Sequence, residues 1–175
     1  TNALNTPSIS AEEAPRLKPY AELAEKLGLF AGQIADGGFT EIEIGFEGEP
    51  AQLNTKPLTA AAVSGALRPI LSDVNMVSAP EILKANGVTL TEATRADSPV
   101  YDNLIRIRVK VDGAWRDVAG SIVAGVPKIV EVKGIALDAK FRPTILYVNN
   151  LDKPGFIGAL GVMLGEAGIN IATFN

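Results

Sequence analysis

The chain has 175 residues, 47% of them hydrophobic, and a formal net charge of −4. This length can bury one core and a smaller satellite core. A net negative charge argues against a protein that binds nucleic acid or anionic lipid, because both partners need a basic surface. Since the chain has no cysteine, no membrane-length apolar run and no secretory leader, we expect a cytoplasmic protein that contacts neither nucleic acid nor membrane.

The absence of histidine narrows the chemistry further. It removes the commonest general base, the commonest metal ligand and every Ser-His or Cys-His nucleophile. The sequence also has no Gly-rich dinucleotide-binding loop and no Walker A loop. We therefore expect no catalytic residue, no metal site and no cofactor in this chain itself.

The first part of the chain predicts two helices separated by a strand. A linker over residues 1–10 precedes a helix that starts near Arg16, where two prolines fit its first turn, and stops at the Asp-Gly-Gly run of residues 36–38. Strict alternation over residues 40–47 indicates a half-buried strand, and a second helix opens at Pro57. This second helix offers small residues for close packing on a sheet or on the first helix: Leu58, Ala61, Ala62, Gly65, Ala66 and Ile70.

The middle of the chain is typical of an antiparallel sheet. A short helix over residues 80–85 and a strand over residues 88–94 lead into it. Alternation over residues 105–111 and 115–123, joined by an Asp-Gly turn, predicts a hairpin. Further turns at residues 125–127 and 133–134 enclose a strand at residues 128–132. We expect an α+β fold in which helices pack on a mostly antiparallel sheet.

From about residue 142 the pattern changes to strand, loop, helix and strand. The strands are predicted over residues 144–149 and 169–174, and the helix over residues 156–167. Two faces of this helix are expected to pack, an apolar face on the sheet and a glycine face on another element. The apolar face consists of Ile157, Leu160 and Leu164, and the glycine face of Gly158, Gly161 and Gly165.

The loop before this last helix carries groups that suit a small zwitterion. Asp152 can cap the helix, and the backbone amides that follow are then free to bind a carboxylate. The Asp152 carboxylate and two asparagine carbonyls can pair with an ammonium group. An ordinary helix start with turn-forming asparagines explains the pattern equally well. The predicted amino-acid site consists of Asn150, Asp152, Gly155, Phe156, Ile157 and Asn170.

The same segment resembles the opening β-α-β unit of ACT domains through the run N-x-x-D-x-P-G-x-I-G-x-x-G-x-x-L-x-x-x-x-I-N-I-A at residues 149–172. The most similar ACT domains are those of D-3-phosphoglycerate dehydrogenases, and residues 2–33 resemble the segment that follows the nucleotide-binding domain in these enzymes. The resemblance implies an intervening allosteric domain over residues 11–142. It also implies the first half of a ferredoxin-like ACT domain over residues 143–175.

The resemblance also implies a function. The family oxidises 3-phospho-D-glycerate to 3-phosphohydroxypyruvate with NAD, the first step of L-serine biosynthesis, and L-serine bound to the ACT domain between subunits inhibits it. The chain would be a regulatory fragment of such an enzyme, inactive alone and part of a homo-oligomer. The positions that match the serine site of the family are Asn150, where relatives have tyrosine or histidine, Asp152 and Asn170.

A second site is implied for the intervening domain, which in the family binds substrate or other anions. Lys128 and Lys140 fall where the family places basic residues for this purpose, and Arg142 is close by. Solvated lysines at strand ends are the simpler interpretation. The remaining basic residues of the sheet, Arg106, Arg108 and Lys110, are expected to form the solvated side of a strand.

Two other functions fit parts of the sequence. A regulatory domain of an L-serine dehydratase is one, although the absence of cysteine argues against this iron–sulfur enzyme. A stand-alone ACT-type amino-acid sensor is the other, and it should carry a complete ACT domain.

Overall fold

The computed structural model describes residues 13–151 and 153–174. The chain forms two compact units, and the boundary between them lies between Phe141 and Arg142. The linker predicted at residues 1–10 and the predicted helix cap Asp152 lie outside the described residues.

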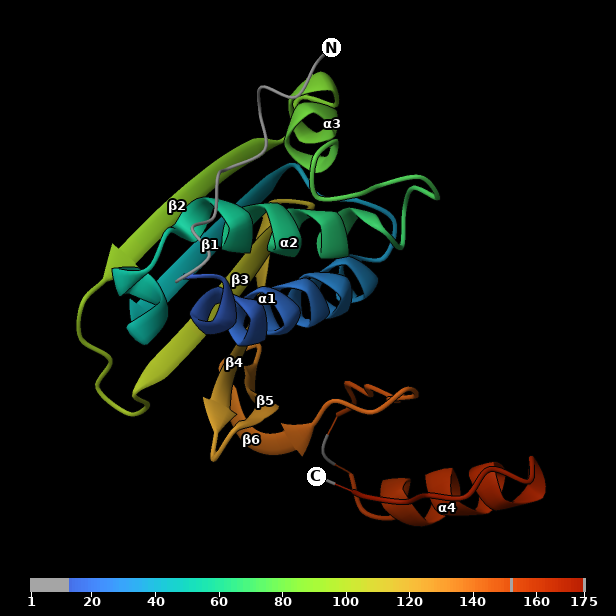
Figure 1. Cartoon of the computed structure of the whole chain (residues 1–175). Coiled ribbons are helices and arrows are strands. Elements are labelled where there is room, and N and C mark those ends of the chain that lie inside the picture. The colour runs from blue at the N-terminus through green and yellow to red at the C-terminus, as the bar shows by residue number, and fades with distance from the viewer. Residues whose placement is uncertain (1–12, 152, 175) are drawn as a thin grey trace. The chain divides into compact units, whose positions relative to one another are not determined.

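The first unit is a sheet with helices on one face (Figure 1). In chain order its elements are α1 (Ala14–Ala35), β1 (Glu41–Gly48), the 3-10 helix η1 (Glu49–Gln52), α2 (Thr55–Leu67), α3 (Ala79–Ala85), β2 (Thr89–Arg95), β3 (Asn103–Val111), β4 (Ala114–Val123), β5 (Val126–Val132) and β6 (Ile135–Lys140). The strand order in the 6-stranded sheet is β2-β1-β3-β4-β5-β6. Only β1 and β2 pair in parallel, since the crossover through α2 and α3 brings the chain back in the same direction. The predicted α+β fold is confirmed.

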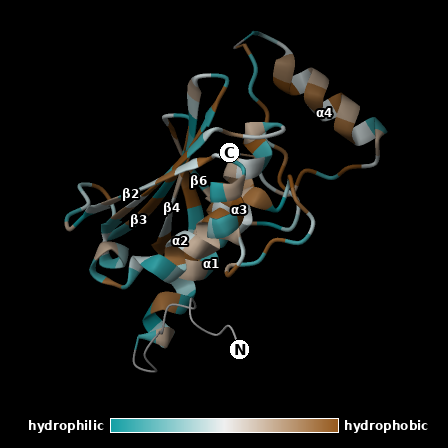
Figure 2. Ribbon diagram, turned by 90° about the horizontal axis from the view of Figure 1, so that it is seen from above, coloured by the Kyte–Doolittle hydropathy of each residue, from teal (hydrophilic) through white to brown (hydrophobic). Residues whose placement is uncertain are grey.

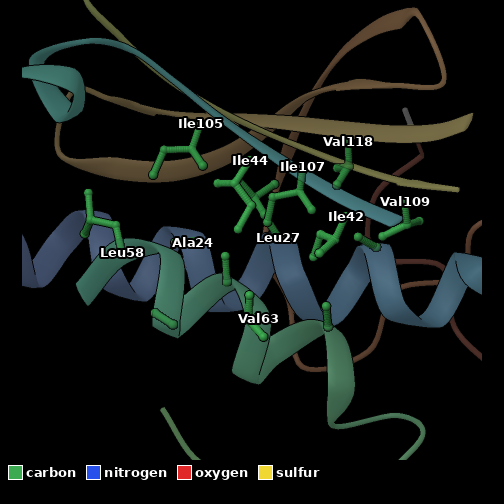
Figure 3. Close-up of a cluster of buried hydrophobic side chains, with 14 of the residues drawn as sticks. Ala24, Leu27, Ile42, Ile44, Leu58, Val63, Ile105, Ile107, Val109 and Val118 are labelled. Atoms are coloured by element: carbon green, nitrogen blue, oxygen red, sulfur yellow. The ribbon is translucent and has the colours of Figure 1, made fainter. Parts of the chain in front are cut away.

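The core lies between the sheet and the helices α1 and α2 (Figures 2 and 3). Alternate residues of β1 are buried, as the sequence predicts, and so are alternate residues of β3. From α1, Ala24 and Leu27 point at this apolar surface (Figure 3), and both are fully buried, as is Leu23. The core strands contribute Ile42, Ile44, Phe46, Ile105, Ile107, Val109 and Val118.

Helices α1 and α2 pack backbone to backbone. A β carbon on Gly28 would lie 2.0 Å from the carbonyl oxygen of Ala62, and one on Gly32 would lie 2.2 Å from that of Ala66. From the other side, a β carbon on Gly65 would lie 2.1 Å from the Glu25 carbonyl oxygen. Only glycine permits this approach. The glycine and alanine surface predicted for the second helix therefore packs on the first helix, but the prediction was wrong for Ile70, which lies beyond the end of α2 and is exposed.

Several boundaries differ from the sequence prediction, and two of the differences have a clear physical reason. Helix α1 begins at Ala14, earlier than Arg16, and Pro19 lies inside it. Pro19 removes one backbone hydrogen bond, and its exposed position near the helix start lets water reach the unpaired carbonyl. The turn between β4 and β5 is formed by Ala124 and Gly125, both with positive φ, so that residues 126 and 127 already belong to β5. The hairpin turns at Asp112-Gly113 and Lys133-Gly134 have the same conformation.

The second unit contains the helix α4 (Phe156–Glu166), as predicted. The two strands predicted at residues 144–149 and 169–174 are not formed, because a strand needs a hydrogen-bonded neighbour and none lies beside these segments among the described residues. The partial ferredoxin-like ACT unit is thus not confirmed, and only its predicted helix is formed.

The packing predicted for α4 is absent from the described residues for the same reason. No residue of α4 is buried, and Figure 2 shows its largely apolar colouring. Ile157, Leu160 and Leu164 have no sheet to cover, and a β carbon on Gly158, Gly161 or Gly165 would meet nothing within 4 Å. Among the described residues no helix is both long enough and apolar enough to cross a lipid bilayer.

Candidate functional site

The predicted anion site is centred on the hairpin of β5 and β6. Lys128 and Lys140 are directly opposite each other in the register of these strands, so their side chains project from the same face. Lys128 Nζ lies 2.8 Å from Asp138 Oδ1, and its side chain is only 18% exposed. Lys140 is exposed and has no ion pair among residues 13–151 and 153–174. One of the two cations is therefore already neutralised.

Arg142, the third residue of the predicted anion site, is the first residue of the second unit. It is exposed and follows Lys140 closely along the chain. Like Lys140, it makes no ion pair within the described part of the chain. These two side chains are the ones with charge available for a ligand.

The predicted amino-acid site lies at the start of α4. Gly155 is the N-cap residue, with a φ of 88°, and no side chain caps the helix among the described residues. The Phe156 amide donates to the Lys153 carbonyl in a long hydrogen bond of 3.4 Å. No backbone acceptor faces the Ile157 amide among these residues, which is the property that an anion site at a helix start requires.

The two asparagines of this site are not joined to each other. Asn150 Nδ2 donates to the Leu151 carbonyl over 3.1 Å, and its side-chain oxygen is left to accept from a ligand. Asn170 is exposed and follows the end of α4, where the Ile169 amide donates to the Leu164 carbonyl. With Asp152 outside the described residues, the structure brings together only part of the predicted site.

The face of the sheet away from the helices carries paired charges. Arg106 Nη1 lies 2.5 Å from Glu131 Oε1 and 3.1 Å from Asp117 Oδ2, and Nη2 lies 3.2 Å from Glu131 Oε2. The hydrogen bond with Glu131 raises the pKa of the Arg106 guanidinium, and the hydrogen bond from Arg106 lowers the pKa of the Glu131 carboxyl. Arg106, Asp117 and Glu131 form a charge cluster, named here the Arg106 cluster.

The other two basic residues of β3 are paired as well. Arg108 Nη1 lies 3.0 Å from Glu43 Oε1, and Lys110 Nζ lies 2.7 Å from Glu41 Oε1. Trp115 on β4 lies beneath both cations, with its ring centroid 4.7 Å from Arg108 Cζ and 5.5 Å from Lys110 Nζ. This side of the sheet is solvated, as predicted, but Arg106, Arg108 and Lys110 are each already ion-paired.

A cavity beside the Arg106 cluster was not predicted. Its volume is about 160 Å³, and residues from β1, β2, β3 and β5 line it together with the loop that joins β2 to β3. Its charged lining residues are Glu47, Arg95, Arg106 and Glu131, and the other lining residues are Ser98, Pro99, Val100, Tyr101, Leu104 and Val130. Sequence alternation places each charge on the outer face of its strand, but only the strand order brings them together.

No group of three or more acidic side chains that could hold a metal ion occurs in the described ranges. The cavity is a concave small-molecule site that the first unit forms by itself.

Comparison with known proteins gives the family. Residues 16–133 match the model of the family described as the D-3-phosphoglycerate dehydrogenase intervening domain. The chain is 34% identical to the D-3-phosphoglycerate dehydrogenase of Methanocaldococcus jannaschii over 98% of the chain and 33% of that protein. The identity to the Bacillus subtilis enzyme is also 34%, with the same coverage.

A chloroplastic relative from Arabidopsis thaliana, named D-3-phosphoglycerate dehydrogenase 2, is 30% identical over 97% of the chain and 30% of its own length. The chain thus spans about a third of the length of the curated relatives that it matches. The family match covers most of the first unit, including α1, the sheet strands β1 to β5 and their turns. The chain therefore belongs to the family of D-3-phosphoglycerate dehydrogenase intervening domains.

Proposed function

We propose that this chain is the regulatory C-terminal part of an NAD-dependent D-3-phosphoglycerate dehydrogenase that catalyses the first step of L-serine biosynthesis. The observation that carries this proposal is the family match over residues 16–133, together with alignments that run along 98% of the chain. Hydride transfer from 3-phospho-D-glycerate to NAD is assigned to the remaining two thirds of the enzyme. This chain has no histidine and no Gly-rich phosphate loop that would serve that chemistry.

In this proposal the protein is cytoplasmic, and the chain contains two ligand-sensing domains. Residues 11–142 act as the intervening allosteric domain, and residues 143–175 act as the amino-acid-binding part. An effector influences a distant active site when it binds two arrangements of the subunits with different affinity.

L-Serine is the proposed ligand at the start of α4. The Ile157 amide and the N-terminal end of the helix suit its carboxylate, while Asn150, Asp152 and Asn170 suit its ammonium and hydroxyl groups. Gly155 at the N-cap leaves room beside the backbone, since a β carbon there would meet nothing within 4 Å.

Phosphoglycerate or a related anion is the proposed ligand of Lys128, Lys140 and Arg142. The exposed cations of Lys140 and Arg142 support this proposal, since no carboxylate of the described residues pairs with them. Lys128 can contribute only in competition with Asp138, which lies 2.8 Å away and is itself 70% exposed.

A homo-oligomer is the proposed assembly. Eleven of the large apolar side chains that are exposed among the described residues lie in the second unit, and contiguous exposed apolar surface often marks a protein–protein interface. These side chains are Ile145, Leu146, Tyr147, Val148, Leu151, Ile157, Val162, Met163, Ile169, Ile171 and Phe174.

The serine proposal is tested by Asp152→Ala in the complete enzyme. NADH formation from phosphoglycerate should persist without serine, and inhibition by L-serine should need a concentration higher by roughly tenfold, because a charge-assisted contact to the ammonium group is lost. Asp73→Ala, which changes an exposed carboxylate of the first unit, is the matched control. Unchanged serine inhibition in the Asp152→Ala enzyme would remove Asp152 from the site.

The anion proposal is tested by calorimetry of the 175-residue chain with 3-phosphoglycerate. Lys140→Ala should weaken binding, whereas Lys84→Ala, an exposed lysine of α3, should leave it unchanged. Equal binding by the two variants would show that the hairpin lysines are only a solvated strand end.

A further inference from the structure

The cavity on the outer face of the sheet is lined by two acidic and two basic side chains. Arg106 and Glu131 neutralise each other through two hydrogen bonds, so neither has charge to spare for a ligand. Glu47 and Arg95 differ from them. They are directly opposite each other on β1 and β2 and both line the cavity. Neither forms an ion pair within the described part of the chain, although the Glu47 carboxylate acts on the nearby Arg106 guanidinium through its charge.

A buried hydroxyl lacks a partner in the same cavity. Ser98 Oγ is inaccessible to solvent and makes no hydrogen bond with any residue in the described ranges. Leaving a buried hydroxyl without a partner costs free energy, and native structures rarely do so without reason. Because Ser98 Oγ is closed to solvent, a ligand in the cavity could reach it only if the side chain turned, so this hydroxyl is not one of the proposed contacts.

The floor of the cavity is apolar. Leu104 and Val130 are buried there and pack with Ala119, and Tyr101 covers this small cluster. Because Leu104 and Val130 are already almost fully buried, an apolar group placed on this floor gains mainly by leaving water itself.

Size limits what can bind. A cavity of about 150 Å³ can hold benzene, whereas drug-sized ligands occupy pockets of roughly 300–1,000 Å³. At about 160 Å³, this cavity suits a branched aliphatic group with charged ends at the rim and excludes nucleotides.

We propose that this cavity binds a small zwitterion with an apolar side chain, of the class of free aliphatic α-amino acids. Arg95 receives the carboxylate, Glu47 receives the ammonium group, and the side chain rests on Leu104, Val130 and Tyr101. This site belongs entirely to the first unit. It is independent of the amino-acid site proposed at the start of α4 and of the lysines of the β5–β6 hairpin.

The test is an NMR titration of the 15N-labelled chain of 175 residues with L-valine. We expect saturable shifts at the backbone amides of residues 98–104. Arg95→Gln and Glu47→Gln should each weaken binding roughly tenfold, because each removes one charge-assisted contact. Arg68→Gln is the matched control, since it removes an exposed arginine that pairs with Glu25 on the helix side. The spectra also show directly whether each variant is folded.

Two valine analogues test the zwitterion itself. Isovalerate lacks the ammonium group and isobutylamine lacks the carboxylate, and both should bind much more weakly than valine. Isovalerate binding as tightly as valine would overturn the proposal in favour of an anion site. Absence of saturable shifts at residues 98–104 up to millimolar valine, or equal shifts in all variants, would also overturn it.

Asp152→Ala separates this site from the one at α4. We expect valine shifts in residues 98–104 to be unchanged in this variant. Valine or serine shifts confined to residues 150–170 and lost in Asp152→Ala would support the regulatory function while refuting the cavity site.

Discussion

Gly28 of α1 lies so close to Ala62 of α2 that a β carbon on the glycine would stand 2.0 Å from the Ala62 carbonyl oxygen and 2.9 Å from its carbonyl carbon. Both atoms belong to backbone that is fixed within a buried helix, so they cannot move aside as the end of a flexible side chain would.

Gly28→Ala should therefore destabilise the first unit by about 3 kcal/mol, the upper end of overpacking effects in a core. Urea unfolding followed by circular dichroism measures the change. Gly45→Ala in β1 is the control, because its new β carbon would meet Arg106 Cβ at an ordinary 3.7 Å. If both variants unfold at the same urea concentration as the wild type, the close contact between the helices does not exist.

Glu131→Gln should lower stability at neutral pH by about 1 kcal/mol, because Arg106 would keep only Asp117 as a charged partner. The folded-state pKa of Glu131 is lowered from its ordinary 4.5, so this contribution is present above pH 4.5 and disappears as the pH falls through the lower folded value. The stabilities of wild type and variant should thus converge in acid. Glu22→Gln, at an exposed position of α1, should show no such convergence.

Tyr20→Phe should cost about 1 kcal/mol, since the buried Tyr20 hydroxyl donates to the Glu49 carboxylate. Burial, and then this hydrogen bond, raise the pKa of the Tyr20 phenol above its ordinary 10.0. The folded protein therefore holds the phenolic proton more tightly than the unfolded chain does, and the stability advantage of Tyr20 declines as the pH rises above 10.0. Unfolding by urea across this pH range provides the measurement.

The control for Tyr20 is Tyr101→Phe, which removes a phenol without a hydrogen bond to other described residues. A constant difference between wild type and Tyr20→Phe from neutral to alkaline pH would contradict the contact with Glu49.

Ile157→Asp should reduce self-association of the chain, because it places a charge on an apolar helix face that is 64% exposed at this residue. Light scattering over a range of concentrations measures the average mass. Val100→Asp introduces the same charge at a residue of the first unit that is 77% exposed, and should have no effect. A wild-type chain that stays monomeric at high concentration would refute the proposed oligomer.

Most of the first unit could be predicted from the sequence because its signals are local. The alternation of Ile42, Ile44 and Phe46 requires only that one face of a strand be buried. Turns such as Asp112-Gly113 depend on residues that tolerate positive φ. The parallel pairing of β1 with β2 could not be predicted from local sequence, because it depends on the path of the chain through α2 and α3.

The second unit shows the opposite case. Its helix could be predicted because apolar residues repeat at helical spacing within one segment. A strand at residues 144–149 instead depends on hydrogen bonds with another strand, which local sequence cannot supply. The residues that resemble an ACT domain are thus present without the sheet that the resemblance implies.

The residues of the candidate sites came from two sources, a local pattern at the start of α4 and the family resemblance at Lys128 and Lys140. Gly155, Phe156 and Ile157 follow one another, and Lys128 faces Lys140 across a short hairpin. The cavity was not predictable, because Glu47, Arg95 and Glu131 are distant in sequence and meet only through the strand order. The ion pair of Lys128 with Asp138 was also missed, although the two lie on paired strands.

Trp115 is the single tryptophan of the chain, and its ring on β4 lies beneath the cations of Arg108 and Lys110. Its fluorescence therefore reports on the sheet alone, whereas the far-ultraviolet signal contains α4 as well. Unfolding curves recorded with the two probes would coincide if residues 142–174 melt together with the sheet, and would separate if they melt on their own. The chain thus carries a built-in reporter of whether its two units are thermodynamically coupled.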